Sequence, residues 1–190
     1  MNYHDTEWGR PVVDDQQLFE KVCLEGFQSG LSWITILRKR EKFRELFCNF
    51  NPDEVAQFST QEVDALVLDP GIIRHRGKIE ATIHNAQRFL EMRATGETLR
   101  EVVWQYADPS VDPEMPHSGE VLAQTPQSLA LSKELKKRGW KFVGPTTMYA
   151  FMQSMGLVND HATTCYVRAE CERQRATVHF PPTTRGGAVR

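Results

Sequence analysis

The spacing of hydrophobic residues along this chain is helical, and no segment alternates between apolar and polar positions as a strand does. Asp14 can cap a helix that runs to about Ser29, and the apolar positions of that helix are Leu18, Phe19, Val22, Cys23 and Phe27. Further helices are predicted from Ser32 onwards, from Ser59 to Leu68, from about His75 to Arg93, from Thr98 to Tyr106, from Thr125 to Gly139, from Pro145 to about Met155 and from near Asn159 onwards. The sequence therefore predicts an all-α protein with one contiguous core.

Proline and glycine mark two segments that should not be helical. Residues 107–121 carry three prolines and Gly119, and we expect them to form an irregular loop. Residues 172–190 carry two adjacent prolines, two adjacent glycines and scattered arginines, and we expect a flexible C-terminal tail. A length of 190 residues suits one domain, or two small lobes that share one core. The predicted domain therefore spans residues 1–171.

The composition is that of an ordinary globular protein, with 40% hydrophobic and 25% charged residues, which excludes wholesale disorder. No run of 18 apolar residues is present, so we expect neither a transmembrane helix nor a membrane partner. We see no secretory signal. The 4 cysteines form no C-x-x-C pair and are interpreted as reduced thiols. These features predict a cytoplasmic protein.

The net charge of −2 gives no overall preference for nucleic acid, but the basic residues are clustered. The clusters lie at residues 38–44, 74–78 and 133–141. Each one alone is more typical of a solvated helix face. They would neutralise DNA phosphates only if the fold brought them to one surface.

Residues 137–147 join two predicted helices through a turn that contains Gly139 and Gly144. A helix that begins just after Gly144 presents backbone N–H groups and the positive end of its dipole, which together can hold a phosphate without reading sequence. A corner made only for packing is the alternative. Basic residues directly before the turn favour contact with a DNA backbone.

Glu25 lies inside an apolar helix, and Tyr3, Trp8 and Trp33 lie in segments rich in polar residues and glycine. A carboxylate beside aromatic rings can bind a planar cation, because ring faces attract cations and the carboxylate adds charge pairing. The alternatives are a solvated or salt-bridged Glu25 and aromatic residues that only pack in the core.

His161 and Cys165 are four residues apart, which on a helix places both side chains on one face at a spacing suitable for a metal. A structural zinc site takes four tetrahedral ligands, so this pair is half a site. Only His4, near the other end of the chain, is an obvious third ligand.

Taken together, these segments closely resemble the DNA-3-methyladenine glycosylase I family. The matching stretches cover nearly everything from Tyr3 to Cys165, and the most specific of them are residues 3–9, 24–33, 71–79, 141–144 and 156–161. The resemblance implies a helix-hairpin-helix DNA glycosylase fold of two lobes sharing a cleft, with a zinc-type cluster joining the chain termini. The hairpin would be residues 137–147, and its candidate DNA contacts are Arg138, Lys141, Gly144 and Thr146.

The resemblance also assigns roles to the candidate site residues. Glu25 matches the catalytic carboxylate of the base pocket, and Tyr3, Trp8 and Trp33 match its aromatic walls. The histidines and cysteine named above (His4, His161 and Cys165) match three ligands of the family's structural zinc. The family's fourth ligand is a cysteine some dozen residues before that first histidine, a position that would precede Met1 of this chain.

The implied activity is a repair reaction: the enzyme flips 3-methyladenine out of alkylated double-stranded DNA and removes it by hydrolysis, with Glu25 or Asp160 steering the water. No lysine follows the predicted hairpin at the position that forms a Schiff base in related enzymes, so we expect a monofunctional enzyme without lyase activity, acting as a monomer. Three alternatives remain open. A glycosylase for another alkylated purine is one, because the sequence does not fix the shape of the pocket. A non-catalytic helical DNA-binding module would not need Glu25 beside Tyr3 and Trp33, and a zinc-stapled interaction domain would need only the metal.

Overall fold

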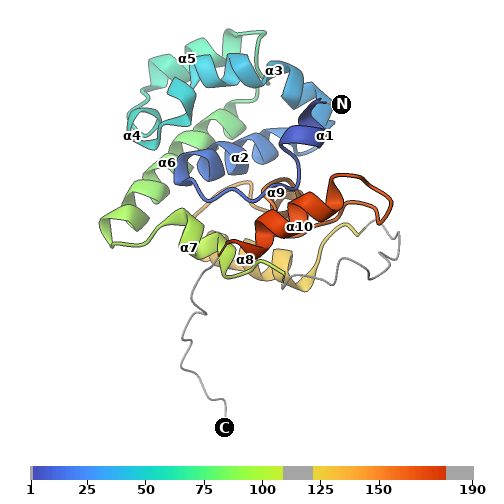
Figure 1. Cartoon of the computed structure of the whole chain (residues 1–190). Helices are drawn as coiled ribbons and strands as arrows, with labels where there is room; N and C mark the ends of the chain where they lie inside the picture. The colour runs from blue at the N-terminus through green and yellow to red at the C-terminus, as the bar shows by residue number, and fades with distance from the viewer. Residues whose placement is uncertain (1, 109–121, 179–190) are drawn as a thin grey trace.

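The computed structural model describes residues 2–108 and 122–178, and every regular element in those two ranges is helical (Figure 1). The elements are α1 (Asn2–Thr6), α2 (Asp15–Gln28), α3 (Trp33–Leu46), the 3₁₀ helix η1 (Cys48–Phe50), α4 (Pro52–Val55), α5 (Thr60–Leu68), α6 (Arg76–Ala94), α7 (Leu99–Trp104), α8 (Pro126–Lys137), α9 (Pro145–Ser154) and α10 (Arg168–Ala176). The prediction of an all-α protein is confirmed. None of the described helices combines the length and the apolar character needed to cross a membrane.

The predicted helix starts are correct where a side chain caps the helix. Asp14 accepts a hydrogen bond from the backbone N–H of Gln17 at 2.9 Å, which satisfies a donor that the first turn of α2 leaves free. Capping boxes open α5 at Ser59 and α7 at Thr98. Cap residues are local signals, and for this reason the sequence alone reveals them.

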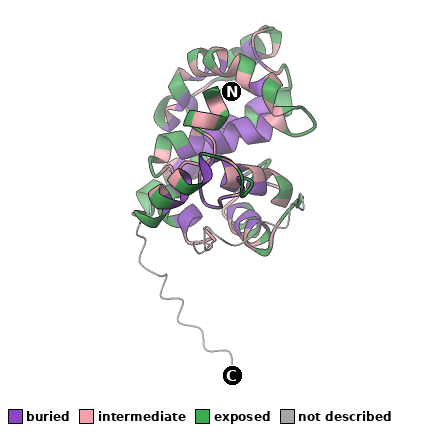
Figure 2. Ribbon diagram, turned by 45° about the vertical axis from the view of Figure 1, so that its right-hand side comes forward, coloured by how far each residue is buried: buried purple, intermediate pink, exposed green. Residues whose placement is uncertain are grey.

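Helix α2 forms the centre of the core. Its residues from Lys21 to Phe27 are all buried, and it packs against α3, α6, α7 and α9. The buried residues concentrate along the helices in the middle of the molecule (Figure 2). One continuous hydrophobic cluster reaches from Leu18 to Val158. Because residues 21–27 of α2 are buried, a charged residue among them is held in a low-dielectric setting, and Lys21 and Glu25 are two such residues.

The helix predicted to begin near Asn159 is wrong. The chain is irregular after α9, and the next helix, α10, begins at Arg168. The Arg168 guanidinium donates to the backbone carbonyls of Asn159 and His161, and the Asn159 amide donates to Glu172 at 2.9 Å. Long-range side-chain bonds therefore occupy carbonyls that a helix would pair locally. His161 and Cys165 do not share a helical face.

The flexible tail expected from residue 172 does not begin there. Helix α10 continues to Ala176, and Glu172 and Arg175 are both buried. The Arg175 guanidinium pairs with Glu172 at 3.0 Å and donates to the carbonyls of Gly156 and Asp108, each at 2.8 Å. A buried, fully bonded arginine fixes this part of the chain. Residues 179–190 and most of the loop predicted at 107–121 (residues 109–121) lie outside the described residues.

Candidate functional site

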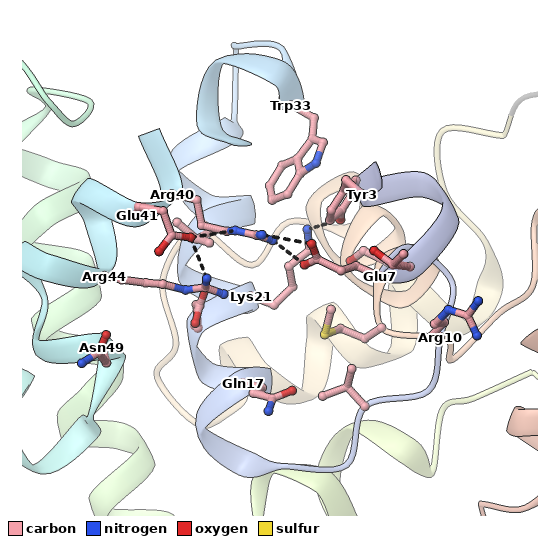
Figure 3. A pocket seen from close by; sticks show the side chains of 16 residues that line it. Tyr3, Glu7, Arg10, Gln17, Lys21, Trp33, Arg40, Glu41, Arg44 and Asn49 are labelled. Atoms are coloured by element: carbon pink, nitrogen blue, oxygen red, sulfur yellow. Dashed lines mark hydrogen bonds and ion pairs between the residues drawn. The ribbon is translucent and has the colours of Figure 1, made fainter. Parts of the chain in front are cut away.

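A cavity of about 620 Å³ opens between α1, α2 and α3, with the end of α9 beneath it (Figure 3). Aromatic and charged side chains line it together. The lining residues are Tyr3, Thr6, Glu7, Arg10, Val12, Gln17, Glu20, Lys21, Leu24, Trp33, Arg40, Glu41, Arg44, Asn49, Ser154 and Met155. A cavity of this size is large enough for a small planar molecule such as a nucleobase.

Two of the predicted aromatic residues meet at this cavity. Tyr3 comes from α1, Trp33 is the first residue of α3, and their ring centroids are 5.4 Å apart. The backbone carbonyl of Tyr3 accepts hydrogen bonds from the N–H groups of Glu7 and Trp8, which closes the short first helix and fixes its position. Sequence segments thirty residues apart thus supply adjacent ring faces.

Glu25 and Lys21 form a buried ion pair one turn apart on α2. The Nζ of Lys21 lies 2.9 Å from Oε1 of Glu25, and the two side chains are 6% and 4% exposed. Burial lowers the pKa of Lys21 to about 8, an effect that the Glu25 carboxylate opposes. Burial likewise raises the pKa of Glu25, and the Lys21 ammonium opposes that shift. Each charge is held in the interior by the other.

Lys21 also contacts both aromatic residues of the cavity. Its Nζ donates to the hydroxyl of Tyr3 at 2.9 Å and lies 3.3 Å from the centroid of a Trp33 ring. Glu25 itself does not line the cavity, whereas Lys21 does. Sequence reasoning gave Lys21 no role. The available signal was its position four residues before Glu25, which on a helix puts an ammonium within reach of the carboxylate.

Two arginines of the basic segment 38–44 close the rim of the cavity rather than face solvent freely. Arg40 makes a two-pronged contact with Glu7, with its Nη2 at 3.0 Å from the carboxylate. Arg44 donates to Glu20 at 2.9 Å. The hydrogen bonds from Arg40 hold the pKa of Glu7 below its ordinary value. These pairs tie α3 to α2 and to the N-terminal segment.

Trp8 does not line the cavity, although the sequence predicted it as a pocket wall. Its ring lies edge-on to His161, with the centroids 4.6 Å apart, and stacks on His4 at 5.9 Å. Trp8 therefore packs against the predicted metal ligands. Asp160 does not line the cavity either: it accepts hydrogen bonds from Tyr149 at 2.5 Å and Gln153 at 2.8 Å.

The three predicted metal ligands do come together in the described part of the chain. One ligand atom each from His4, His161 and Cys165 lies within 4.8 Å of the others, and Sγ of Cys165 is 3.7 Å from Nε2 of His4. The sequence analysis grouped His161 and Cys165 because of their helical spacing, but the segment that carries them is irregular. The group is one that could hold a metal ion.

The chemistry of His161 fits that of a metal ligand. Its Nδ1 is within hydrogen-bond distance of Oδ1 of Asn159 at 2.8 Å, and its Nε2 is buried with no hydrogen-bond partner among the described residues. Burial is the main cause that lowers the pKa of His161 to about 4, and the nearby Arg168 guanidinium acts in the same direction. The imidazole is therefore neutral near pH 7, which is the form that binds metals, and its second nitrogen is oriented by a neighbour.

The four residues predicted to contact DNA lie in the turn between α8 and α9 and in the first turn of α9. Lys141 and Thr146 are exposed, and Gly144 is the N-cap residue of α9 and makes no side-chain cap. Arg138 is already paired: its guanidinium makes a two-pronged contact with Glu97 and also binds Glu134 at 2.9 Å.

This turn is rigidly attached to α6. The amide of Asn85 donates to the carbonyl of Lys141 at 3.0 Å and accepts from the N–H of Lys141 at 2.8 Å. The next residue, Phe142, has a φ of 57° and a side chain that is 39% exposed. A phenylalanine held at positive φ and left partly in solvent is costly, which is typical of a functional position.

Comparison with known proteins identifies this arrangement of helices as that of a DNA glycosylase. A crystal structure of 3-methyladenine DNA glycosylase I superposes with a TM-score of 0.82 at 48% identity, covering 87% of this chain and 91% of that one. A second solved structure, a Tyr-to-Phe variant of 3-methyladenine DNA glycosylase I in complex with 3-methyladenine, has a TM-score of 0.81 at 37% identity, covering 88% of this chain and 90% of that one.

Sequence comparison agrees. The family model for methyladenine glycosylase matches residues 1–169. The DNA-3-methyladenine glycosylase of Haemophilus influenzae is 50% identical over 167 residues, which is 87% of this chain and 90% of that protein. DNA-3-methyladenine glycosylase 1 of Escherichia coli is 52% identical over 165 residues, covering 86% and 88%. The chain belongs to the methyladenine glycosylase family.

Proposed function

We propose that this protein is a monofunctional DNA glycosylase that removes 3-methyladenine from alkylated double-stranded DNA and acts as a monomer. The observation that carries the proposal is the buried Glu25 carboxylate, linked through one ammonium group to the ring face of Trp33 and the hydroxyl of Tyr3. The carboxylate, the ring face and the hydroxyl are groups that bind a cation, and they lie beside or in contact with a cavity of nucleobase size. Family membership supports the same activity.

The chemistry of the substrate explains why such a site suffices. A base must leave the DNA stack before an enzyme can reach it, and this costs least for a damaged base. Methylation at N3 gives adenine a positive charge and makes it a good leaving group, so the enzyme needs no strong general acid. Its main task is to select the cationic base. A site built to accept hydrogen bonds from the base rejects analogues that lack the donors.

The attacking water requires a base or an acceptor near the sugar. Glu25 is the acidic residue that the proposal retains for this role, because both oxygens of a carboxylate can accept hydrogen bonds. Asp160 is dropped from it, since Tyr149 and Gln153 already occupy its Oδ2 atom. Glu25 would thus bind the base and steer the water.

Identifying the released base tests this proposal. The purified protein is incubated with methylated double-stranded DNA, and the released bases are separated by chromatography. We expect 3-methyladenine, and no protein–DNA adduct when sodium borohydride is present to trap a Schiff base. Failure to release 3-methyladenine would contradict the proposed activity, and a trapped adduct would contradict its monofunctional character.

Trp33 provides the stacking surface in this proposal, so Trp33→Ala should weaken binding of free 3-methyladenine by about 1–3 kcal/mol, as stacked bases on aromatic side chains typically do. Isothermal titration calorimetry measures this directly. Trp140 is a matched control, because it is buried in the core and packs on Phe19 instead of lining the cavity. Trp140→Phe should leave the affinity unchanged, and an unchanged affinity in Trp33→Ala would mean that Trp33 only packs.

DNA would meet the protein at the turn between α8 and α9, which we propose acts as the helix-hairpin-helix element. The first turn of α9 has backbone N–H groups without an intrahelical partner, and Gly144 lets a phosphate approach them. The exposed Lys141 adds a positive charge beside that turn. Arg138 is left out of this proposal, because Glu97 and Glu134 already neutralise it.

Zinc is the metal that the cluster of His4, His161 and Cys165 suits best, because two imidazoles and a thiolate are ligands that zinc prefers. When bound, the metal would be structural and would staple α1 to the irregular segment before α10. Gly9 lies against this cluster: a Cβ atom there would be 2.4 Å from Cε1 of His161, so the segment must carry glycine to let His161 in.

We expect the purified protein to contain about one equivalent of zinc by mass spectrometry. Removing it with a chelator should lower the melting temperature, since a metal present at 100 times its Kd stabilises the folded state by about 2.7 kcal/mol. His161→Ala should lose the metal, whereas His84→Ala, a histidine that instead contacts the carbonyl of Gly139, should keep it. Zinc that neither copurifies nor shifts the melting of the apo-protein would rule the site out.

The alternative of a non-catalytic DNA-binding module is disfavoured by the position of Glu25. Such a module has no use for a carboxylate that is 4% exposed and connected to two aromatic residues at a cavity. Burying a charge is costly unless it is paired, and Lys21 pairs with Glu25 as the salt-bridge alternative expected. The position of this buried pair beside an aromatic-lined cavity is what favours a functional site.

A further inference from the structure

Lys21 lies at the centre of the proposed base site, and the proposed reaction gives it no task. Its Nζ contacts the Glu25 carboxylate at 2.9 Å, the Tyr3 hydroxyl at 2.9 Å and the face of Trp33 at 3.3 Å from the ring centroid. Figure 3 shows the side chain rising from α2 toward the labelled Tyr3 and Trp33. Only 5% of the residue is exposed.

These three contacts are the ones that a cationic base would need. Glu25 and Tyr3 provide charge pairing and a hydrogen-bond partner, and Trp33 provides a ring face. Non-bonded atoms in contact are separated by about 3.5–4.0 Å, so nothing can be inserted between the ammonium and the Trp33 ring. The ring of a base and the ammonium of Lys21 therefore exclude each other from this face.

Lys21 lines the cavity and contacts Glu25, which does not line it. The other cations nearby are already paired. Arg40, whose guanidinium carbon is 5.9 Å from the Tyr3 ring centroid, is held by Glu7, and Arg44 is held by Glu20. Among the described residues, Glu25 is the carboxylate that forms an ion pair with the Lys21 ammonium, and a second cation brought to Glu25 would meet the repulsion of the first.

We propose that Glu25, Trp33 and Tyr3 form an ammonium-binding site that Lys21 occupies from within the chain, and that a ligand enters only by displacing Lys21. Lys21 then acts as a specificity-determining residue, because every incoming base competes with it for the same three partners. The identity of the competing base rests on the proposed function, whereas the occupation of the site by Lys21 is independent of it.

The first test uses the wild-type protein labelled with ¹³C at the ε-carbons of lysine. The Trp33 ring should shift one ε-methylene NMR signal to unusually high field, and Lys21→Met should lack that signal. Saturation with 3-methyladenine should return the signal to the ordinary lysine position. A signal that keeps its shift in the saturated protein would show that base and lysine coexist, which overturns the proposal.

The second test compares affinities. Lys21→Met should bind 3-methyladenine at least fivefold more tightly than the wild type, because the internal competitor is gone. Lys42→Met is the matched control: it removes one positive charge from an exposed lysine that pairs with Glu45, and it should leave the affinity unchanged. Equal affinities in the wild type and Lys21→Met would overturn the proposal.

A third test separates this inference from the proposed function. Lys21→Ala should bind n-propylammonium, seen as a rise in melting temperature at millimolar concentration, and the wild type should not. If no variant binds or releases 3-methyladenine, the proposed function fails while this result still decides the ammonium site. A Lys21→Ala protein whose melting temperature does not rise with propylammonium would count against the site. If this variant does not fold, the high-field lysine signal of the wild type decides the question.

Discussion

Glu25→Gln should lower kcat/KM for release of 3-methyladenine from methylated DNA by roughly 10²–10³-fold, or about 3–4 kcal/mol of transition-state stabilisation. A hydrogen bond to a charged group contributes about 1.5–3 kcal/mol, and the Glu25 carboxylate would accept more than one, from the base and from the water. Glutamine removes that charge. It also leaves the buried Lys21 without its counter-ion, which should lower the stability of the fold as a separate effect.

The measurement is the initial rate of base release at several DNA concentrations, with the melting temperature recorded for each protein. Glu41→Gln is the control, because Glu41 also lines the cavity but its side chain is 80% exposed and contacts arginines on its own helix. Its rate should match the wild type. A Glu25→Gln enzyme that stays folded and retains the wild-type rate would remove Glu25 from the mechanism.

Most helices were predictable from the sequence because their signals are local. Thr98 with Glu101 and Ser59 with Glu62 form capping boxes that are visible as spacing alone. Elements of three to five residues, such as η1 and α4, were not predicted, because they are too short to show a hydrophobic period. The segment after Asn159 was assigned wrongly, because arginine side chains from α10 set its backbone and periodicity does not report such contacts.

The candidate site was likewise predictable only in part. Glu25 and Trp33 were singled out as residues, and resemblance to a family supplied their roles, yet the ammonium between them was not foreseen. The burial of this ion pair depends on helices such as α3 and α9 packing against α2, and that is a tertiary property. Arg138 was a candidate DNA contact because it is a basic residue in the hairpin that the resemblance implies. Its partner Glu97 is 41 residues away in the sequence, too far for a spacing argument.

The N-terminal segment, residues 2–12, connects the cavity with the metal cluster. It carries Tyr3 to the cavity and His4 to the metal cluster, and it is fastened to the end of α9 by hydrogen bonds from the N–H of Gly9 to Ser154 and from the N–H of Val12 to Met155. Both sites therefore depend on how closely this segment can approach the turn that follows α9.

Gly156→Ala tests that dependence and should destabilise the fold by about 2–5 kcal/mol. Gly156 has a φ of 72°, where a residue with a Cβ atom is strained by about 1–2 kcal/mol. A Cβ atom at Gly156 would also lie 2.6 Å from backbone atoms of Arg10 and Pro11, and such overpacking costs about a further 1–3 kcal/mol. The backbone cannot yield without moving the N-terminal segment, so 3-methyladenine release should fall as well.

Gly96→Ala is the matched control, because Gly96 has a φ of 81° but open space around its Cβ position. Gly96→Ala should lower the free energy of unfolding only by the backbone strain, about 1–2 kcal/mol, and should leave the rate of base release unchanged. Urea unfolding measures both free energies, and their difference isolates the contact with Arg10 and Pro11. Equal losses in the two variants would mean that the N-terminal segment yields freely, and that the close approach at Gly156 does not hold Tyr3 and His4 in place.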